Sequence, residues 1–219
     1  MKVIELVDLV QDFFANDIIG DQKGIYHPGV IIGHLRNVYN QSIYEAWEKG
    51  KHESDFSQLD AWTRRYSCGF QEQQGVTDYV FLPFTPAQLP DGMGIRKVCD
   101  HDDSLNVFAP IENGANVVFS ELEVDTLDSV PTYQLEQSNL ASGDGEPSHI
   151  LRLAKLPTDG SINSVDVWMI VPLEQMGDYD DIALPMGEEE TLVQKVIAVM
   201  TQKPKADTSN DMVASAGMQ

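Results

Sequence analysis

The sequence predicts a mixed α+β fold. An N-terminal helical bundle precedes an antiparallel β-sandwich or barrel, and a C-terminal helix packs back on the bundle before an extended tail. Three observations lead to this prediction. Apolar residues recur at helical spacing over the first third of the 219-residue chain. In the middle, short segments alternate apolar and polar residues between turns rich in Pro, Gly and Asp, as half-buried antiparallel strands do. Helical spacing then returns near the end.

Two long helices are expected at the start of the chain. The first covers 2–15, because its apolar residues recur every three or four positions: Val3, Leu6, Val7, Val10 and Phe14. The second begins at Pro28, since proline is tolerated in a first helical turn, and ends near Lys49, where Gly50 can stop it. Its apolar face is wide, which indicates that the helix is covered on more than one side.

A shorter third helix is expected over 55–66. Ser54 is its predicted N-cap, and Arg64 and Arg65 would lie favourably near its C-terminal end. The residues predicted to point inward from this helix are Phe56, Leu59 and Trp62.

Seven short strands are predicted between the helical parts. Pro/Gly/Asp turns separate several of them, for example PTDG at 157–160. This number of short strands and turns favours a small sandwich or barrel. The predicted strands are 77–82, 94–99, 105–109, 116–121, 131–136, 149–156 and 164–171.

The C-terminal helix is expected to begin with three glutamates, Glu188 to Glu190, because the helix dipole favours acids in a first turn. Pro204 would stop it. Its buried stripe would consist of Leu192, Val193, Val196, Ile197 and Met200. The predicted organisation is a helical bundle over 1–67, an antiparallel β domain over 68–182, a C-terminal helix over 183–203 that joins the bundle, and an extended tail over 204–219.

The charge of the chain is strongly acidic. It has 14 Lys and Arg against 35 Asp and Glu, a net charge of -21, and most of the excess lies after residue 66. Such a surface repels phosphate backbones and anionic lipids, which argues against electrostatic binding to nucleic acid or membrane. No apolar run is long enough to span a bilayer, and the acids within the first fourteen residues argue against a signal peptide. The two cysteines, Cys68 and Cys99, are no disulfide framework.

A search for catalytic signatures finds little. The segment 99–103, Cys-Asp-His-Asp-Asp, could bind a metal through His101 and two carboxylates, but a strand that ends in an acidic turn explains it as well. Residues 174–190 contain seven acids and no base, yet they lack the glycine that a calcium loop needs at its sixth position. No catalytic residue, metal ligand or cofactor is therefore predicted.

Two stretches resemble structural neck proteins of tailed bacteriophages, particularly those of crAss-like phages. The first is IIGHLRNVYNQSIYEAWEKGKHESDFSQL, at 31–59. The second, at 179–214, has a Leu-Pro entry at Leu184 and Pro185, an acidic helix start, an apolar helix, a Lys-Pro break at Lys203 and Pro204, and a tail with Asp207, Asn210 and Asp211. Together these stretches cover about a third of the chain.

This resemblance implies a virion structural protein without enzymatic activity. It would form a homo-oligomeric ring of about twelve copies in the head-to-tail connector, joining the portal protein to other neck or tail proteins. After synthesis in the bacterial cytoplasm it would reside in the neck or tail of the virion. Double-stranded DNA would pass through the ring during ejection without specific binding, because an acidic lumen does not neutralise phosphates.

Specific residues follow from this hypothesis. The wide face of the second helix suits subunit packing, so Ile31, His34, Leu35 and Val38 are predicted interface residues, together with Asp207, Asn210 and Asp211 of the tail. Four acids are predicted to face a lumen or solvent: Glu174, Asp178, Asp180 and Asp181. Two alternatives stay open, a metal-dependent enzyme built on the acidic clusters and a monomeric intracellular adaptor.

Overall fold

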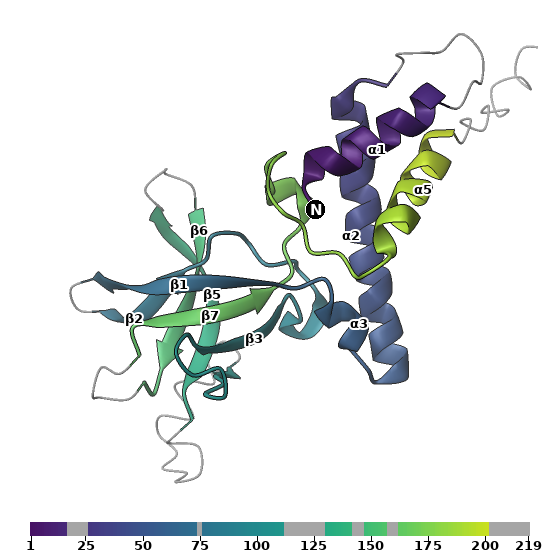
Figure 1. The fold of residues 1–219 in the computed structure, drawn as a ribbon. Helices are drawn as coiled ribbons and strands as arrows, with labels where there is room; N and C mark the ends of the chain where they lie inside the picture. The colour runs from purple at the N-terminus through teal and green to yellow at the C-terminus, as the bar shows by residue number, and fades with distance from the viewer. Residues whose placement is uncertain (17–25, 74–75, 112–129, 142–146, 157–161, 202–219) are drawn as a thin grey trace, which may run out of the picture.

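The chain forms a helical lobe and a β-barrel-like lobe that lie side by side (Figure 1). The computed structural model describes residues 1–16, 26–73, 76–111, 130–141, 147–156 and 162–201. The helical lobe consists of α1 (Val3–Asn16), α2 (Pro28–Glu53) and α5 (Glu188–Thr201). The fold class is therefore α+β, as predicted. None of the helices in these ranges is both long and apolar enough to cross a bilayer.

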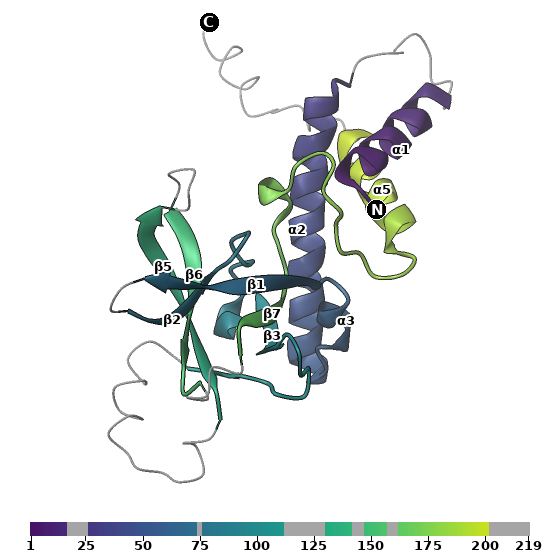
Figure 2. The ribbon, with the colours of Figure 1, turned by 60° about the vertical axis from the view of Figure 1, so that its left-hand side comes forward.

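The helix α2 is the central rod of the molecule, about 39 Å long at 1.5 Å per residue. Figure 2 shows α1 and α5 on one side of it and the barrel on the other. The helix begins as the sequence predicts, with Pro28 in its first turn, and His27 caps it by accepting a hydrogen bond from the Gly29 backbone N–H. The predicted inward residues of α1, from Val3 to Val10, are all buried.

The end of α2 differs from the prediction. Gly50 does not stop the helix, which continues to Glu53 and ends at Ser54 in the left-handed conformation, with φ of 54°. The reason lies in packing, because a Cβ on Gly50 would lie 2.5 Å from the Phe56 ring. The glycine is needed for this close approach of the chain and not for a turn.

The third helix is also shorter than predicted. Only α3 (Ser57–Asp60) is helical in the predicted range 55–66. Ser54, the predicted N-cap of this third helix, is instead the C-cap of α2. Leu59 and Trp62 are buried as expected, whereas Arg64 and Arg65 begin a strand. The strand region thus begins at residue 64, four residues before the predicted domain boundary at 68.

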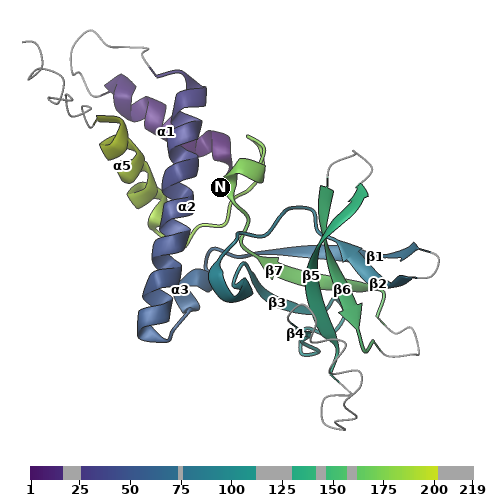
Figure 3. The same cartoon turned by 180° about the vertical axis from the view of Figure 1, so that it is seen from behind.

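Seven strands form one nearly closed, barrel-like sheet in the order β3-β7-β1-β2-β6-β5-β4 (Figure 3). Five of the predicted strands are confirmed in position. The strand bounds are β1 (Arg64–Gln73), β2 (Val76–Phe81), β3 (Ile95–Asp100), β4 (Ala109–Pro110), β5 (Thr132–Ala141), β6 (Pro147–Ala154) and β7 (Ser164–Met169), with the short 3-10 helices η1 (Pro90–Gly92) and η2 (Leu173–Gln175).

The segment 106–111 brings the two ends of the sheet together. The Phe108 N–H donates to Val98 O of β3 at 2.9 Å, and the Ala109 N–H donates to Pro131 O beside β5 at 2.9 Å. The strand predicted at 105–109 is therefore mostly a connection whose last residue begins β4. The strand predicted at 116–121 lies outside the described residues.

One hydrophobic core runs through both lobes. In the helical lobe, α5 contacts α1 and α2, with Leu192, Val196 and Ile197 buried and Val193 and Met200 partly buried. In the barrel the inward side chains come from every second residue of the strands, for example Val165, Val167 and Met169 of β7. The continuity of this core fixes the barrel against the helices.

Candidate functional site

The densest group of polar side chains lies on the outer face of β1, β7 and β3. The strand register aligns Arg65, Trp168 and Lys97 in one row across the three strands. The next row contains Ser67, Asp166 and Cys99. Since side chains alternate between the two faces of a sheet, both rows lie opposite the buried valines of β7.

Asp166 is at the centre of this group, with 1% of its side chain exposed. One carboxylate oxygen accepts from Ser67 Oγ at 2.6 Å and lies 3.0 Å from His101 Nδ1, and the other pairs with the Arg65 guanidinium. Burial alone would raise the pKa of the Asp166 carboxyl, but the hydrogen bonds from these three residues hold it below its usual range. Asp166 therefore stays ionised and pins three segments of the barrel together.

The group contains Ser, His and Asp, but it is not arranged for nucleophilic catalysis. In a serine hydrolase the histidine lies between the serine and the carboxylate. Here the carboxylate lies between them, and His101 turns the same Nδ1 atom toward Asp166 and, at 3.4 Å, toward Ser67. This geometry supplies no separate base to activate the Ser67 hydroxyl.

Trp168 lies between two cations at the exposed end of the same face. The Arg65 guanidinium carbon is 5.4 Å and the Lys97 ammonium 5.0 Å from the centre of its ring. Lys97 also donates to Ser104 O at 2.9 Å, which brings the β3–β4 connection beside the tryptophan. The result is a cationic and aromatic face on a chain that is otherwise strongly acidic.

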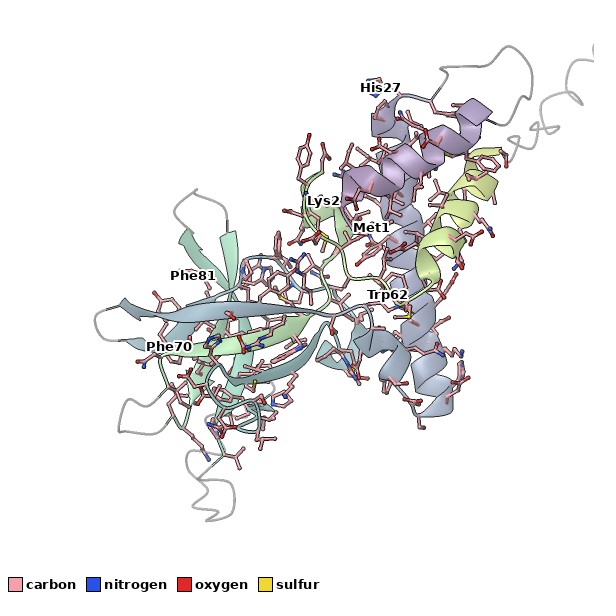
Figure 4. The ribbon with its side chains drawn as sticks, in the orientation of Figure 1. Met1, Lys2, His27, Trp62, Phe70 and Phe81 are labelled. Atoms are coloured by element: carbon pink, nitrogen blue, oxygen red, sulfur yellow. The ribbon has the colours of Figure 1, made fainter. Side chains whose placement is uncertain are left out.

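The junction of the lobes is built by the strap, which we define as residues 176–183. Its backbone pairs with the start of α1: the Ile4 N–H donates to Asp178 O at 2.9 Å, and the Ile182 N–H donates to Met1 O at 2.9 Å. Figure 4 labels Met1 and Lys2 at this position. Arg64 of β1 pairs with Asp181, and the Tyr39 hydroxyl of α2 donates to Ala183 O at 3.2 Å. The strap thus ties α1, α2 and β1 together.

A shallow pocket of about 170 Å³ lies on the barrel side of the strap. This volume is below the range of roughly 300–1,000 Å³ that small-molecule sites occupy. The residues that line it are Arg64, Tyr66, Phe84, Met176, Tyr179, Asp180 and Asp181. The Arg64 guanidinium lies 5.9 Å from the centre of the Tyr66 ring. The cation that lines the pocket therefore already interacts with the aromatic ring that lines it.

The predicted interface residues on α2 are corrected by their burial. Ile31 and Leu35 are fully buried and Val38 is 5% exposed, because α1 and α5 cover this face within the same chain. Only His34 is partly exposed. The wide apolar stripe therefore serves the core of the helical lobe. Asp207, Asn210 and Asp211 lie outside the described residues.

The four acids predicted to face a lumen or solvent have exposed side chains: Glu174, Asp178, Asp180 and Asp181. Several of them also have structural contacts that the sequence did not indicate. Glu174 accepts a hydrogen bond from Asn40, and Asp180 accepts from the Gly177 backbone N–H at 2.7 Å. The acidic segment is thus partly a connecting element as well as a charged surface.

In the segment 99–103 the residues do not converge on one point. Asp100 accepts from the Asp102 backbone N–H at 3.0 Å, while His101 turns to Asp166. Within the described residues no group of three or more His, Cys, Asp or Glu side chains could hold a metal ion. Asp166 and Ser67 were missed as site residues, although a lone carboxylate in the apolar strand 164–171 was a visible signal.

Comparison of the sequence with models of protein families and with curated proteins finds no match.

Proposed function

We propose that the chain is a structural subunit of the head-to-tail connector of a tailed bacteriophage of the crAss-like type. It would form a homo-oligomeric ring in the virion neck, between the portal protein and other neck or tail proteins. Double-stranded DNA would leave the head through this ring. The proposal starts from the sequence resemblance, to which the fold adds two supporting observations.

The observation that supports the proposal best is the return of α5 to the N-terminal helices. It packs on α1 and α2, so that a helical lobe made from both ends of the chain supports a barrel made from its middle. This order of helices, strands and a final helix is the plan that the resemblance to neck proteins implies. A subunit with two lobes can offer different surfaces to its two neighbours, as a ring requires.

The second supporting observation is the distribution of charge. Glu174, Asp178 and Asp180 form no ion pair among the described residues, and their side chains are exposed. Exposed, unpaired carboxylates next to DNA keep phosphate groups at a distance, because they release no counterions on contact. Such a surface suits a channel through which DNA passes without adhesion.

Co-expression with the portal protein of the same genome, followed by negative-stain electron microscopy, tests the proposal. The expected result is an additional layer of density with the rotational symmetry of the portal. A matched control carries Asp178→Asn, an exposed change that should leave the layer intact. Bare portals, together with absence of the chain from purified virions, would overturn the proposal.

A further inference from the structure

Two apolar side chains project further into solvent than any other large hydrophobic residue described. Met186 is 104% exposed and lies just before α5 in the helical lobe. Leu105 is 88% exposed and lies in the β3–β4 connection on the barrel. A single exposed apolar residue is ordinary, so the surroundings of each decide what it means.

On the side of β3 and β7 the surroundings of Leu105 are aromatic and cationic, whereas its own connection has two exposed acids, Asp102 and Asp103. Lys97 reaches Ser104 O, next to Leu105, and covers Trp168 together with Arg65. We call this surface the barrel face and define it as Arg65, Lys97, Trp168, Leu105 and the 45% exposed Val107. Trp, Arg and apolar side chains of this kind are enriched in protein interfaces.

The charge of the barrel face comes mainly from Lys97. Among the described residues it has no carboxylate partner, although the chain as a whole has a net charge of -21. Arg65 is half exposed and shares its charge with Asp166. Asp103 of the same connection turns its carboxylate to the Leu105 backbone N–H at 2.9 Å. The Lys97 ammonium therefore lies beside an exposed leucine and a tryptophan, a combination that fits a partner with both acidic and apolar side chains.

The surroundings of Met186 have the opposite charge. Glu189 and Glu190 follow it in the first turn of α5, both are exposed, and neither forms an ion pair within the described ranges. We call this surface the acidic knob and define it as Met186, Glu189 and Glu190. The methionine makes this surface suited to an aromatic partner, because a flexible thioether packs favourably against an aromatic ring.

We propose that the acidic knob of one chain docks on the barrel face of a second copy. The two surfaces are complementary in charge, and each has a projecting apolar side chain. They belong to different lobes of the same chain (Figure 1). The contact is therefore heterologous, the type that generates a ring when its rotation closes. This inference rests on the proposed ring function and names the surfaces that would join neighbouring subunits.

Cross-linking between variants of the full chain that each carry one added surface cysteine tests the contact. The native Cys68 and Cys99 are 5% and 0% exposed, and burial raises the pKa of both thiols, so they do not compete for a maleimide reagent. Leu105→Cys and Met186→Cys proteins are treated with a short bis-maleimide, separately and mixed. The reaction is run on the concentrated purified chain and on the chain co-expressed with portal protein.

The expected result is a covalent dimer in the mixture and none with either variant alone, because a heterologous contact joins unlike surfaces. The chain with both substitutions should form a ladder of longer oligomers. Dimers between like variants, the lack of any mixed dimer in both samples, or a Met186→Cys product with the portal instead of a second copy would each overturn the inference.

A charge exchange separates the contact from chance collisions. Lys97→Glu in the Leu105→Cys protein should slow the mixed cross-link at least tenfold, and Glu189→Lys with Glu190→Lys in the Met186→Cys protein should restore the rate. Lys49→Glu, a charge reversal at an exposed position of α2, is the matched control and should have no effect. Circular dichroism checks that each variant is folded.

Failure of this inference and failure of the proposed function give different results. If the portal gains a ring of this chain but the two cysteines do not react with each other, other surfaces form the ring and the function stands. If the mixed dimer forms but virions do not contain the chain, the contact between copies is supported and the proposed neck function is contradicted.

Discussion

Asp166 is a carboxylate with almost no exposed surface, set between Val165 and Val167 in β7. An ionised group at such a position is tolerated only when it is fully hydrogen-bonded. We predict that Asp166→Asn lowers the free energy of unfolding by about 2 kcal/mol, since it weakens charge-assisted hydrogen bonds. Urea denaturation at pH 7 measures this loss. Asp178→Asn, at an exposed position, is the control and should change stability by less than about 0.5 kcal/mol.

The same residue predicts a pH dependence. Because the pKa of Asp166 is lower in the folded chain than in the unfolded chain, its stabilisation is complete above the unfolded value of 3.8 and is lost as pH falls through the folded value. The free energy of unfolding of Asp166→Asn should therefore fall less than that of the wild type between pH 5 and the acid range. Equal slopes for the two proteins would contradict this assignment.

Gly94 allows two backbone segments to meet. A Cβ at this position would lie 2.0 Å from the carbonyl oxygen of Ala87, and neighbouring backbone hydrogen bonds hold both segments to Ile170. We predict that Gly94→Ala destabilises the chain by about 3 kcal/mol, because backbone must move to make room. Gly33→Ala, inside α2 at a position where the new Cβ would meet no other part of the chain within 4 Å, should stabilise it by about 0.5–1 kcal/mol. Thermal unfolding of both variants measures these changes: the melting temperature should fall in Gly94→Ala and rise in Gly33→Ala.

Among the elements, the strap decides how the lobes are joined. The side chain of Tyr39, whose hydroxyl donates to Ala183 O of the strap, is buried, whereas the side chains of the Arg64–Asp181 ion pair are 40% and 55% exposed. Exposed ion pairs contribute little, since water and salt screen them. The hydrogen bond of Tyr39 should therefore contribute more than the ion pair.

We predict that Tyr39→Phe costs about 1 kcal/mol and Asp181→Asn less than that, when both are measured by urea denaturation. The ring of Tyr39 stays in place in the first variant, so only the hydrogen bond to Ala183 is removed. A larger cost for Asp181→Asn would mean that the ion pair, not the buried contact, holds the strap.

The element that sequence analysis mistook is β1. Leu59 and Trp62 have helical spacing, which favoured a helix continuing to residue 66. From Arg65 onward the side chains alternate, with the buried Cys68 on one face of the sheet and Ser67 on the other. This alternation is a period of two, typical of a strand, but it begins within a few residues of the helical pattern. Short overlapping patterns leave the boundary undetermined until the pairing with β7 selects the strand.

At the scale of the whole molecule, charge is the dominant property. A net charge of -21 on one chain makes its surface repel itself. We predict that raising the salt concentration from about 0.01 M to about 0.5 M increases the melting temperature, because the Debye length falls from about 30 Å to a few Å. A melting temperature that falls or stays constant would show that local ion pairs outweigh this repulsion.

The same charge predicts weak contact with DNA. In a gel-shift assay at physiological salt, the chain should not retard double-stranded DNA, since its exposed carboxylates cannot replace counterions on phosphate. Tight retardation of DNA would contradict both this expectation and the channel role proposed above. Lys97→Glu serves as a control for the barrel face and should leave the result unchanged.

Patterns that repeat along the chain were readable without the structure. The helical spacing of Val3, Leu6 and Val10 and the alternation in the strand segments report which side of an element is buried, because that side is set by a local period. The acidic start of α5 reports where a helix begins, because the helix dipole favours acids in the first turn. The meeting of Ser67, His101 and Asp166 was not readable, since Ser67 and Asp166 are 99 positions apart in the sequence. Strand register brings them together, and register depends on which strands pair. A local pattern of apolar residues does not identify the pairing strand. For the same reason the stripe of Ile31, Leu35 and Val38 was visible, while its covering by α1 and α5 instead of a second chain followed from tertiary packing.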